Sequence, residues 1–398
     1  MINASPTSDA LSRRRGFMAL AALFVVDFVP NYAQYQLSPM AIQIMETFGI
    51  DKVAYSALFA APMILGVPLA FASGVLLGRH NPRNVVLGAL CISTLGSLIV
   101  LLAPSYLPLF LGFTLEGCCL SFVVPTCVIV ATKDLGARGV TWGVGLMFAA
   151  ASLSQALATA TTRLLPGLLE AREISFGLFV LATLTFLILF RVPVDVRSRG
   201  REEDKKPAES PLSTVGQLLR GRDYRILCVC LFLNMGIFVL VASLVPTALS
   251  EVGVDAVHAG AFASFFTLGN LLGCFVVPAL AGRVLGMRSL VALLAVLGAL
   301  LVNVVPAGPA LIACIALAGL FVGGLKPLLV SLSARAKAAR GGREAMASAL
   351  AAMMQALGAI VLPTYVILPL VGGALDSAYL LGGICLLVCA ALAYWLPE

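Results

Sequence analysis

Charged residues are scarce in this chain. Aspartate, glutamate, lysine and arginine make up 11% of the 398 residues, whereas a typical soluble domain carries about 25%. Hydrophobic residues account for 60%. A chain of this composition cannot cover its surface with polar side chains. We therefore expect a membrane protein with many spans, and an ordinary soluble enzyme or binding domain is excluded.

The sequence also lacks the motifs of catalysis and of nucleotide-driven transport. Its two histidines, His80 and His258, fall in predicted loops, and no HExxH motif or serine–histidine constellation is present. The GxxxxGK(S/T) phosphate loop of a primary pump is missing as well. The ten cysteines lie in apolar stretches, without the spacing of metal ligands or of a disulfide framework. We expect neither an enzyme nor a bound metal or cofactor.

Long apolar stretches dominate what is present. A membrane-spanning helix needs about 20 apolar residues. Stretches of this length recur, with equal numbers on each side of a charged segment, residues 193–222, whose proline, serine and mixed charge predict a solvated linker. Its last third, PLSTVGQLLRGR, could form a short interfacial helix. The predicted domains are residues 1–192 and 223–398, and the predicted spans are 16–38, 53–77, 84–103, 107–132, 139–164, 174–192, 224–249, 258–281, 288–305, 308–333, 345–370 and 374–396.

Lysine and arginine are distributed unevenly between the loops. With the amino terminus inside, nearly all of them fall in cytoplasmic loops, and only Lys52, Arg163 and Arg172 lie on the opposite face. This bias follows the positive-inside rule and predicts an even number of spans with both termini in the cytoplasm. The formal net charge of +7 is then a consequence of topology. It favours contact with membrane lipids and indicates no nucleic-acid partner.

Two loops repeat a glycine–arginine pair about half a chain apart. GVLLGRHNPRNV (74–85) follows the second predicted span, and PALAGRVLGMRSL (278–290) follows the eighth. Two repeats joined by a long cytoplasmic loop are typical of one class of secondary transporters. The chain resembles the major facilitator superfamily over essentially its whole length. The residues that match the gating loops of that family are Arg79, Arg83, Arg283 and Arg288.

The resemblance implies a fold and a location. The expected fold is an all-α membrane protein with twelve transmembrane helices in two pseudo-symmetric six-helix bundles, and we expect a monomer in the bacterial cytoplasmic (inner) membrane. Gly78 and Gly282 occupy positions where the family pattern has aspartate, and Phe113 stands where an arginine is frequent. The fifth span lacks the glycine–proline pair of drug/proton antiporters. The subfamily is therefore open.

Three ionisable side chains lie well inside predicted spans: Asp27 in the first, Glu116 in the fourth and Lys326 in the tenth. A charge at bilayer depth costs on the order of 3 kcal/mol by insertion scales, and such residues usually mark a functional site. A structural ion pair between helices is the alternative. The resemblance implies that the first, fourth, seventh and tenth spans line a central cavity. This placement favours function and adds Asn234 of the seventh span.

Polar residues of the first and tenth spans extend this set. In DFVPNYAQYQLSP (27–39), polar side chains recur on one helical face, which must meet protein or water. In the tenth span, Pro327 frees the carbonyl four residues earlier, beside Lys326, and nearby glycines permit close packing or hinging. Ser38 and Asn270 are further polar candidates. The predicted substrate-binding and coupling residues are Asp27, Asn31, Gln34, Tyr35, Glu116, Asn234, Lys326 and Gln355.

These features favour a secondary active transporter of a small organic solute that works by alternating access. One buried lysine and no buried arginine favour a small organic anion such as a monocarboxylate, because polyanions usually need bidentate clamps. Lys326 is expected to pair with Asp27 or Glu116 in the empty cavity, or to stay charged and receive the substrate. One of these carboxyl groups is expected to carry a transported proton. Proton-driven efflux of cations or drugs is the alternative, and a transporter-like substrate sensor is a further one.

Overall fold

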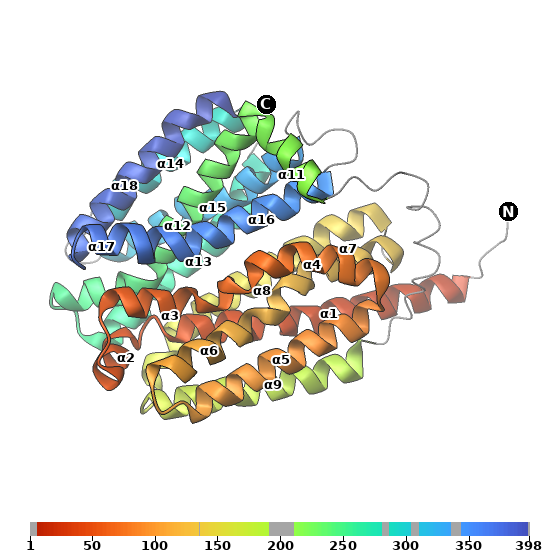
Figure 1. The fold of residues 1–398 in the computed structure, drawn as a ribbon, viewed down its shortest axis with the longest axis horizontal. Coiled ribbons are helices and arrows are strands. Elements are labelled where there is room, and N and C mark those ends of the chain that lie inside the picture. Colours follow the sequence, from red (N-terminus) through yellow and green to blue (C-terminus); the bar gives the residue numbers. More distant parts are fainter. Residues whose placement is uncertain are drawn as a thin grey trace.

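Every regular element in the described part of the chain is a helix (Figure 1). The computed structural model describes residues 6–134, 136–190, 211–280, 286–303, 310–335 and 344–396. Within these ranges, 10 helical segments are long and apolar enough to cross a membrane, and the shorter helix Met287–Asn303 is apolar as well. The expected all-α membrane fold is confirmed, and helices form most of the described part of every predicted stretch.

The first half of the chain contains two interrupted spans. The second predicted span divides at Leu65, just after Pro62, and the fourth divides at a 3-10 turn, Gly117–Cys119. Helix starts follow local capping chemistry: the Asp51 side chain accepts a hydrogen bond from the Ala54 amide at 2.8 Å. The helices are α1 (Pro6–Gln36), α2 (Ala41–Phe48), α3 (Lys52–Ile64), α4 (Gly66–Arg79), α5 (Pro82–Leu102), α6 (Tyr106–Glu116), α7 (Leu120–Asp134), α8 (Gly136–Thr161) and α9 (Leu168–Leu189).

The second half begins with the short helix predicted at the end of the linker, α11 (Pro211–Arg220). The eleventh predicted span changes to a π-helical segment at Leu362–Ile367. The rest of the linker and residues 281–285 lie outside the described residues. The other helices are α12 (Arg222–Glu251), α13 (Ala256–Leu280), α14 (Met287–Asn303), α15 (Ala310–Arg335), α16 (Glu344–Val361), α17 (Leu368–Leu370) and α18 (Leu375–Leu392).

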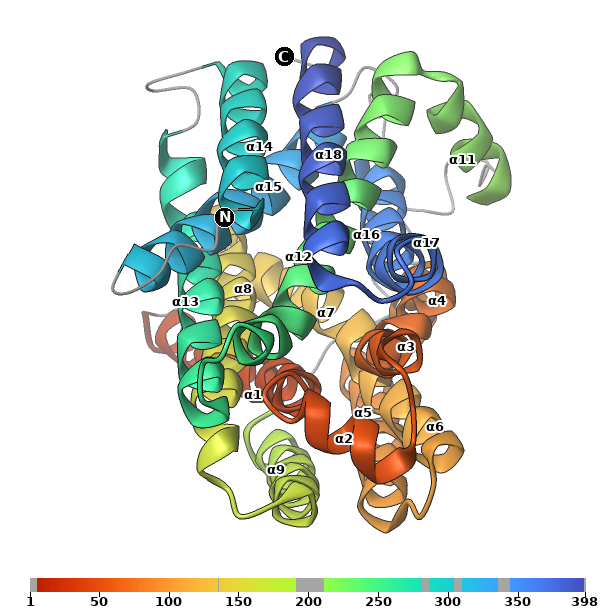
Figure 2. The same ribbon diagram turned by 90° about the vertical axis from the view of Figure 1, so that its left-hand side faces the viewer.

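The helices form two groups, α1 to α9 and α11 to α18, that face each other (Figure 2). The groups meet where α8 packs on α13 and where α16 packs on α3 and α4. We call the end of the molecule that carries Arg79 and Arg222 the linker end. The end that carries Lys52 and Glu251 is the distal end.

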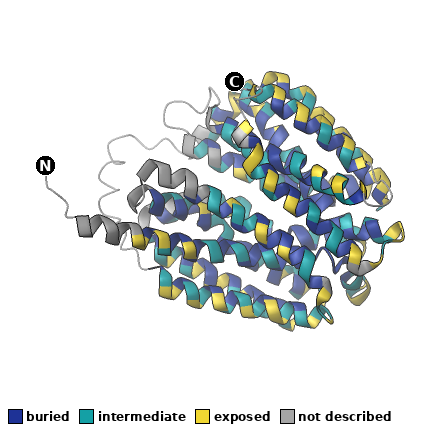
Figure 3. Ribbon diagram, turned by 180° about the vertical axis from the view of Figure 1, so that it is seen from behind, coloured by how far each residue is buried: buried dark blue, intermediate teal, exposed yellow. Residues whose placement is uncertain are grey.

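Large apolar side chains cover the outward-facing sides of both groups. Leu102, Leu272 and Leu380 are 70%, 57% and 57% exposed, whereas buried residues fill each group and the contact between them (Figure 3). Many exposed leucines on helices of this length would be unfavourable in water and are favourable against lipid. The outward faces are therefore the lipid-facing surface.

Helices α13 and α15 approach each other closely because glycines line their contact. A Cβ atom added to Gly319 would lie 1.9 Å from the Phe266 carbonyl oxygen, and one added to Gly269 would lie 1.9 Å from that of Ala316. Both helices carry glycines four residues apart, Gly269 with Gly273 and Gly319 with Gly323. This is the small-residue packing by which membrane helices associate. It places Lys326 beside α13.

Replacing Gly319 with alanine is expected to destabilise the protein by about 1–3 kcal/mol, the usual cost of overpacking a tight contact. The added methyl group would force α13 and α15 apart at Phe266. Thermal unfolding can be followed with a thiol-reactive dye, because buried cysteines such as Cys127 and Cys230 become accessible only on unfolding. Gly88→Ala is the matched control, since nothing lies within 4 Å of its added Cβ. Equal unfolding midpoints for both variants would contradict the packing argument.

Candidate functional site

Lys326 lies on α15 against an aromatic ring. Its Nζ atom is 2.9 Å from the centroid of the Phe238 ring on α12. Cys274 of α13 is close enough to the ammonium to interact with it electrostatically. A ring face attracts a cation, but it supplies no anion. Across the described residues, no carboxylate is within ion-pair distance of Lys326.

The predicted ion pair between Lys326 and Asp27 or Glu116 is therefore wrong for this conformation. Asp27 lies on α1 and Glu116 at the end of α6, both in the first half, whereas α15 packs on α12, α13, α14 and α16. Neither α1 nor α6 is among the helices that pack extensively on α15. Spans of opposite halves can line one cavity without bringing their charged groups into contact.

A row of polar side chains runs along the contact between α8 and α13. Asn270 donates a hydrogen bond to the Ser152 hydroxyl at 3.2 Å, and the Thr159 and Thr267 hydroxyls are 3.4 Å apart. We call this row the polar seam; its members are Ser152, Gln155 and Thr159 on α8 and Thr267, Asn270 and Cys274 on α13. The Cys274 thiol is 3.7 Å from the Asn270 side-chain oxygen, so the seam ends next to Lys326.

Helix α1 joins the seam at Gln155, which lies between Ser152 and Thr159 on α8. Gln155 donates a hydrogen bond to the Asn31 side-chain oxygen at 3.3 Å, and Asn31 donates to the Asp27 backbone carbonyl at 2.8 Å. The Asp27 side chain is 6% exposed and has no hydrogen-bond or ion-pair partner among the described residues. Polar side chains thus continue from Asn31 on α1 through α8 and α13 to Cys274, next to Lys326, and Asp27 lies one helical turn from Asn31.

The remaining residues of the α1 stripe turn toward other helices. Gln34 donates a hydrogen bond to the Phe59 carbonyl at 2.8 Å, and the Tyr35 ring packs edge-on against the Phe59 ring. Ser38 donates to the Ala242 carbonyl of α12 at 2.7 Å. A single polar face along one cavity is therefore not observed. Several helices surround this stripe: Asn31 bonds to α8, Gln34 to α3, and Ser38, just beyond the end of α1, to α12.

Glu116 is enclosed in the first half. It has no exposed surface, and neither carboxyl oxygen has a hydrogen-bond partner among the described residues. The 3-10 turn that follows packs tightly on α3, since a Cβ on Gly117 would lie 1.7 Å from the Pro62 carbonyl oxygen. Desolvating an ionised carboxylate without a partner costs several kcal/mol. The structure does not connect Glu116 to the polar seam.

The other two predicted residues lie in the second half. Asn234 of α12 donates a hydrogen bond to the Val322 carbonyl of α15 at 3.0 Å, which holds these two helices together. Its side-chain oxygen has no partner among the described residues. Gln355 of α16 is partly exposed and makes no polar contact within the described part of the chain. The structure brings neither residue into the seam.

Both charged helices contain a proline near the charge, Pro30 in α1 and Pro327 in α15. In α1, the Cys119 thiol lies 4.0 Å from the carbonyl oxygen of Val26, the group that Pro30 cannot bond. In α15, the Cys274 thiol lies 3.9 Å from the carbonyl oxygen of Gly323, which Pro327 leaves free. Because a thiol is a weak hydrogen-bond donor, each helix has a weakly bonded backbone carbonyl near its charged residue, Asp27 in α1 and Lys326 in α15.

The sequence of the chain matches a known family over most of its length. A model of the Major Facilitator Superfamily aligns with residues 21–363. This chain belongs to that superfamily. The family, the helical fold and the role in transport across a membrane are thereby established together.

Known members are related to this major facilitator protein at low identity. The 3-(3-hydroxy-phenyl)propionate transporter of Escherichia coli is 22% identical over 69% of this chain and 68% of its own length. Among solved structures, the Escherichia coli fucose:proton symporter has a TM-score of 0.65 and 16% identity, covering 97% of this chain and 100% of that one. The human organic anion transporter has a TM-score of 0.65 and 17% identity, with coverages of 95% and 99%. These structural likenesses show a shared fold.

The arginines of the predicted gating loops in this major facilitator protein are described only in part. Arg83 donates a hydrogen bond to the Leu187 carbonyl of α9 at 3.3 Å, and Arg288 donates to the Leu396 carbonyl at 2.6 Å. Both arginines thus lie in the first turn of a helix, α5 or α14, and bond to a backbone carbonyl elsewhere in their own half. Arg79 ends α4, but its side chain is outside the described parts, and Arg283 lies outside the described residues.

Ser152, Gln155 and Thr159 were not predicted from the sequence. They recur on α8 at i, i+3 and i+7, which places them on one helical face, as in the polar stripe that drew attention to α1. Thr267, Asn270 and Cys274 repeat this spacing on α13, and only Asn270 was considered. The sequence therefore showed that α8 and α13 each have a polar face. It did not show that these two faces contact each other.

Within the described residues, an ion pair and hydrogen bonds also join the two halves of the transporter at the distal end. Lys52 forms an ion pair with Glu251 at 2.7 Å and donates to the Gly373 carbonyl at 3.1 Å. Farther in, the Ser56 and Thr364 hydroxyls are 2.9 Å apart. The distal end is thus closed by contacts that α3 makes with α12 and with the segments flanking α17 (Figure 1).

Replacing Lys52 with glutamine is expected to shift the population toward distal-open molecules by up to about five-fold, because exposed ion pairs contribute about 0–1 kcal/mol. Spin labels at Glu46 and Val252, in a cysteine-depleted background, would report the distance across this end. Glu46→Gln, made with the label moved to Thr47, is the control, because Glu46 is exposed and unpaired within the described residues. An unchanged distance distribution in Lys52→Gln would show that this ion pair does not hold the distal end closed.

Proposed function

We propose that this protein is a proton-coupled secondary transporter of a small organic anion, best described as a monocarboxylate. The observation that carries the proposal is the environment of Lys326. Its ammonium lies next to the polar seam, on a helix weakened by Pro327, and no carboxylate in the described structure pairs with it. A desolvated cation without a counter-ion is unfavourable. A substrate carboxylate would supply the missing partner.

The comparisons support an anion with an apolar group. One relative is named for 3-(3-hydroxy-phenyl)propionate, a monocarboxylate that carries a ring, and one structural neighbour is an organic anion transporter. In this chain, the Phe238 ring lies directly against Lys326 and offers an apolar surface beside the cation. A single ammonium suits one carboxylate better than a polyanion, which usually needs bidentate arginine contacts.

Asp27 is our first candidate for the group that carries the transported proton. Its side chain is buried and unpaired among the described residues, so that it favours neutralisation by a proton over ionisation. Its helix reaches the seam through Asn31, which gives Asp27 a route of coupling to substrate. Glu116 is the second candidate, because it is buried without a partner but lies away from the seam.

We further propose that the linker end faces the cytoplasm, with both termini there, in the inner membrane of a bacterium. The basic residues of the loops support this orientation. The closed distal end then corresponds to an inward-facing state of a transporter that alternates access as a monomer. The arginines of the predicted gating loops would take part in closing the linker end. They are Arg79, Arg83, Arg283 and Arg288.

Uptake into proteoliposomes tests this function. Purified protein would be supplied with labelled short carboxylates, arylpropionates, amino acids, sugars and organic cations, with and without an imposed pH gradient. Protein-free liposomes give the background from passive permeation. Saturable, gradient-dependent uptake of carboxylates is expected. Transport of organic cations alone would reject the anion function and favour proton-driven efflux, with Asp27 as the group that binds the cation.

A further inference from the structure

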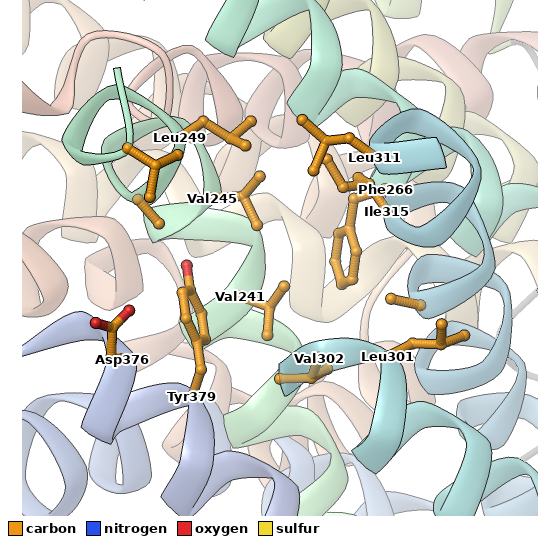
Figure 4. A pocket seen from close by; sticks show the side chains of 13 residues that line it. Val241, Val245, Leu249, Phe266, Leu301, Val302, Leu311, Ile315, Asp376 and Tyr379 are labelled. Atoms are coloured by element: carbon orange, nitrogen blue, oxygen red, sulfur yellow. The ribbon is translucent and has the colours of Figure 1, made fainter. Parts of the chain in front are cut away.

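A cavity inside the second half lies apart from the polar seam. Its volume is about 70 Å³, and α12, α13, α14, α15 and α18 form its walls (Figure 4). Aliphatic side chains line most of it, among them Val241, Val245 and Leu249 of α12. Neither Lys326 nor Asp27 lines this cavity. It is therefore a separate feature from the proposed transport site.

One side of the cavity is polar and acidic. Tyr379 is 7% exposed, and its hydroxyl has no hydrogen-bond partner among the described residues. Figure 4 shows this hydroxyl pointing toward the wall formed by Val245 and Leu249, with the Asp376 carboxylate beside it. Glu251 is also near enough to interact electrostatically with Tyr379, but its charge is already paired with Lys52 at 2.7 Å. Among the described residues, no basic side chain lines the cavity, and Asp376 has no ion-pair partner.

The side chains that line the cavity indicate which kind of small molecule it would bind. An unpaired buried hydroxyl is costly and is rare in native proteins, which points to a missing partner. A partner next to Asp376 is favoured when it carries N–H donors and a positive charge, because charge-assisted hydrogen bonds are the stronger kind. The aliphatic walls favour an apolar body. At about 70 Å³, the space is smaller than the roughly 150 Å³ cavity that holds benzene, so that body is a short alkyl chain.

We propose that this cavity binds a small primary alkylammonium ion. Its chain lies among Val241, Val245 and Leu249, and its ammonium donates hydrogen bonds to the Tyr379 hydroxyl and the Asp376 carboxylate. The mouth is at the distal end, where Asp376 and Val252 are exposed. The proposal does not depend on transport of an anion, because it shares no residue with the Lys326 site.

Ligand-observed NMR on the full chain in lipid nanodiscs tests the proposal, with n-butylammonium as the probe and n-butanol as its neutral counterpart. Saturable binding of n-butylammonium is expected, at least about five-fold tighter than that of n-butanol. Asp376→Asn should weaken it about ten-fold, and Tyr379→Phe a few-fold, while Glu46→Gln, which removes an exposed acid at the same end, should leave it unchanged. Ala248→Leu, which fills part of the cavity, should weaken both probes.

Three results would overturn this assignment. Equal affinities for the two probes would show that the cavity does not select a cation. Unchanged n-butylammonium affinity in Asp376→Asn would remove the acidic residue from the site. Loss of binding in Asp27→Asn, with Asp376→Asn unaffected, would place the cation in the central region instead. Retained binding in Lys326→Met supports the separation of the two sites, whatever that variant does to transport.

Discussion

Replacing Lys326 with methionine is expected to abolish transport of the anion while the protein stays folded. Methionine keeps an apolar chain against the Phe238 ring but removes the charge that we assign to the substrate carboxylate. Loss of one partner from a desolvated charge pair costs roughly 3 kcal/mol, which corresponds to a fall of about 100-fold in transport efficiency. Initial rates of uptake into proteoliposomes, measured over a range of substrate concentrations, give this value.

The charge-retaining variant Lys326→Arg is the matched control, and it should keep a measurable part of the activity. Thermal unfolding of both variants should stay near that of the native protein, because the ammonium makes no ion pair with the described residues that its removal could break. Transport by Lys326→Met with normal affinity would show that the lysine is structural. The anion site would then have to lie elsewhere.

Asp27→Asn is expected to separate transport from the proton gradient. An asparagine cannot gain or lose a proton but keeps the shape of the buried side chain beside the Asn31–Gln155 contact. The variant should no longer accumulate substrate against a gradient. It should still exchange labelled for unlabelled substrate across the membrane, because this exchange needs no net proton movement. Uptake and exchange measured on the same proteoliposomes distinguish the two activities.

Glu116→Gln provides the comparison for the second carboxyl group. Glu116 lies away from the polar seam, so we expect accumulation to survive in this variant. The opposite pattern, with accumulation lost only in Glu116→Gln, would move the proton site to α6. Normal accumulation in both single variants would reject proton coupling through these residues altogether.

The fold could be predicted from the sequence because lipid imposes a local rule. Each span must be apolar over its own length, and this is visible without knowledge of its neighbours. The helices therefore follow the predicted stretches, and α11 appears where a short helix was predicted. The breaks at Pro62 and at Leu362–Ile367 were not predicted. Both lie where α3 packs against α16 and the π-helical segment of the opposite half, a contact that the sequence does not reveal.

The candidate site was harder to predict, because its contacts join residues far apart in the chain. Periodicity placed Asn31 and Gln34 on one face of α1. In the structure, however, Asn31 is hydrogen-bonded to α8 and Gln34 to α3. Burial of Lys326 was clear from the sequence, whereas its partner was not: a phenylalanine ring takes the place of the expected carboxylate. A helical pattern identifies which buried polar residues need an interaction partner. Which residue becomes that partner depends on how the helices pack together.

Movement of protons driven by the substrate tests the central claim most directly. Proteoliposomes that contain a pH-sensitive dye would receive a hydrophilic monocarboxylate from outside, with protein-free vesicles as the background. We predict a protein-dependent, saturable change of internal pH that is absent in Lys326→Met. Saturable uptake of the carboxylate without any change of internal pH, or the same pH change in Lys326→Met, would contradict it.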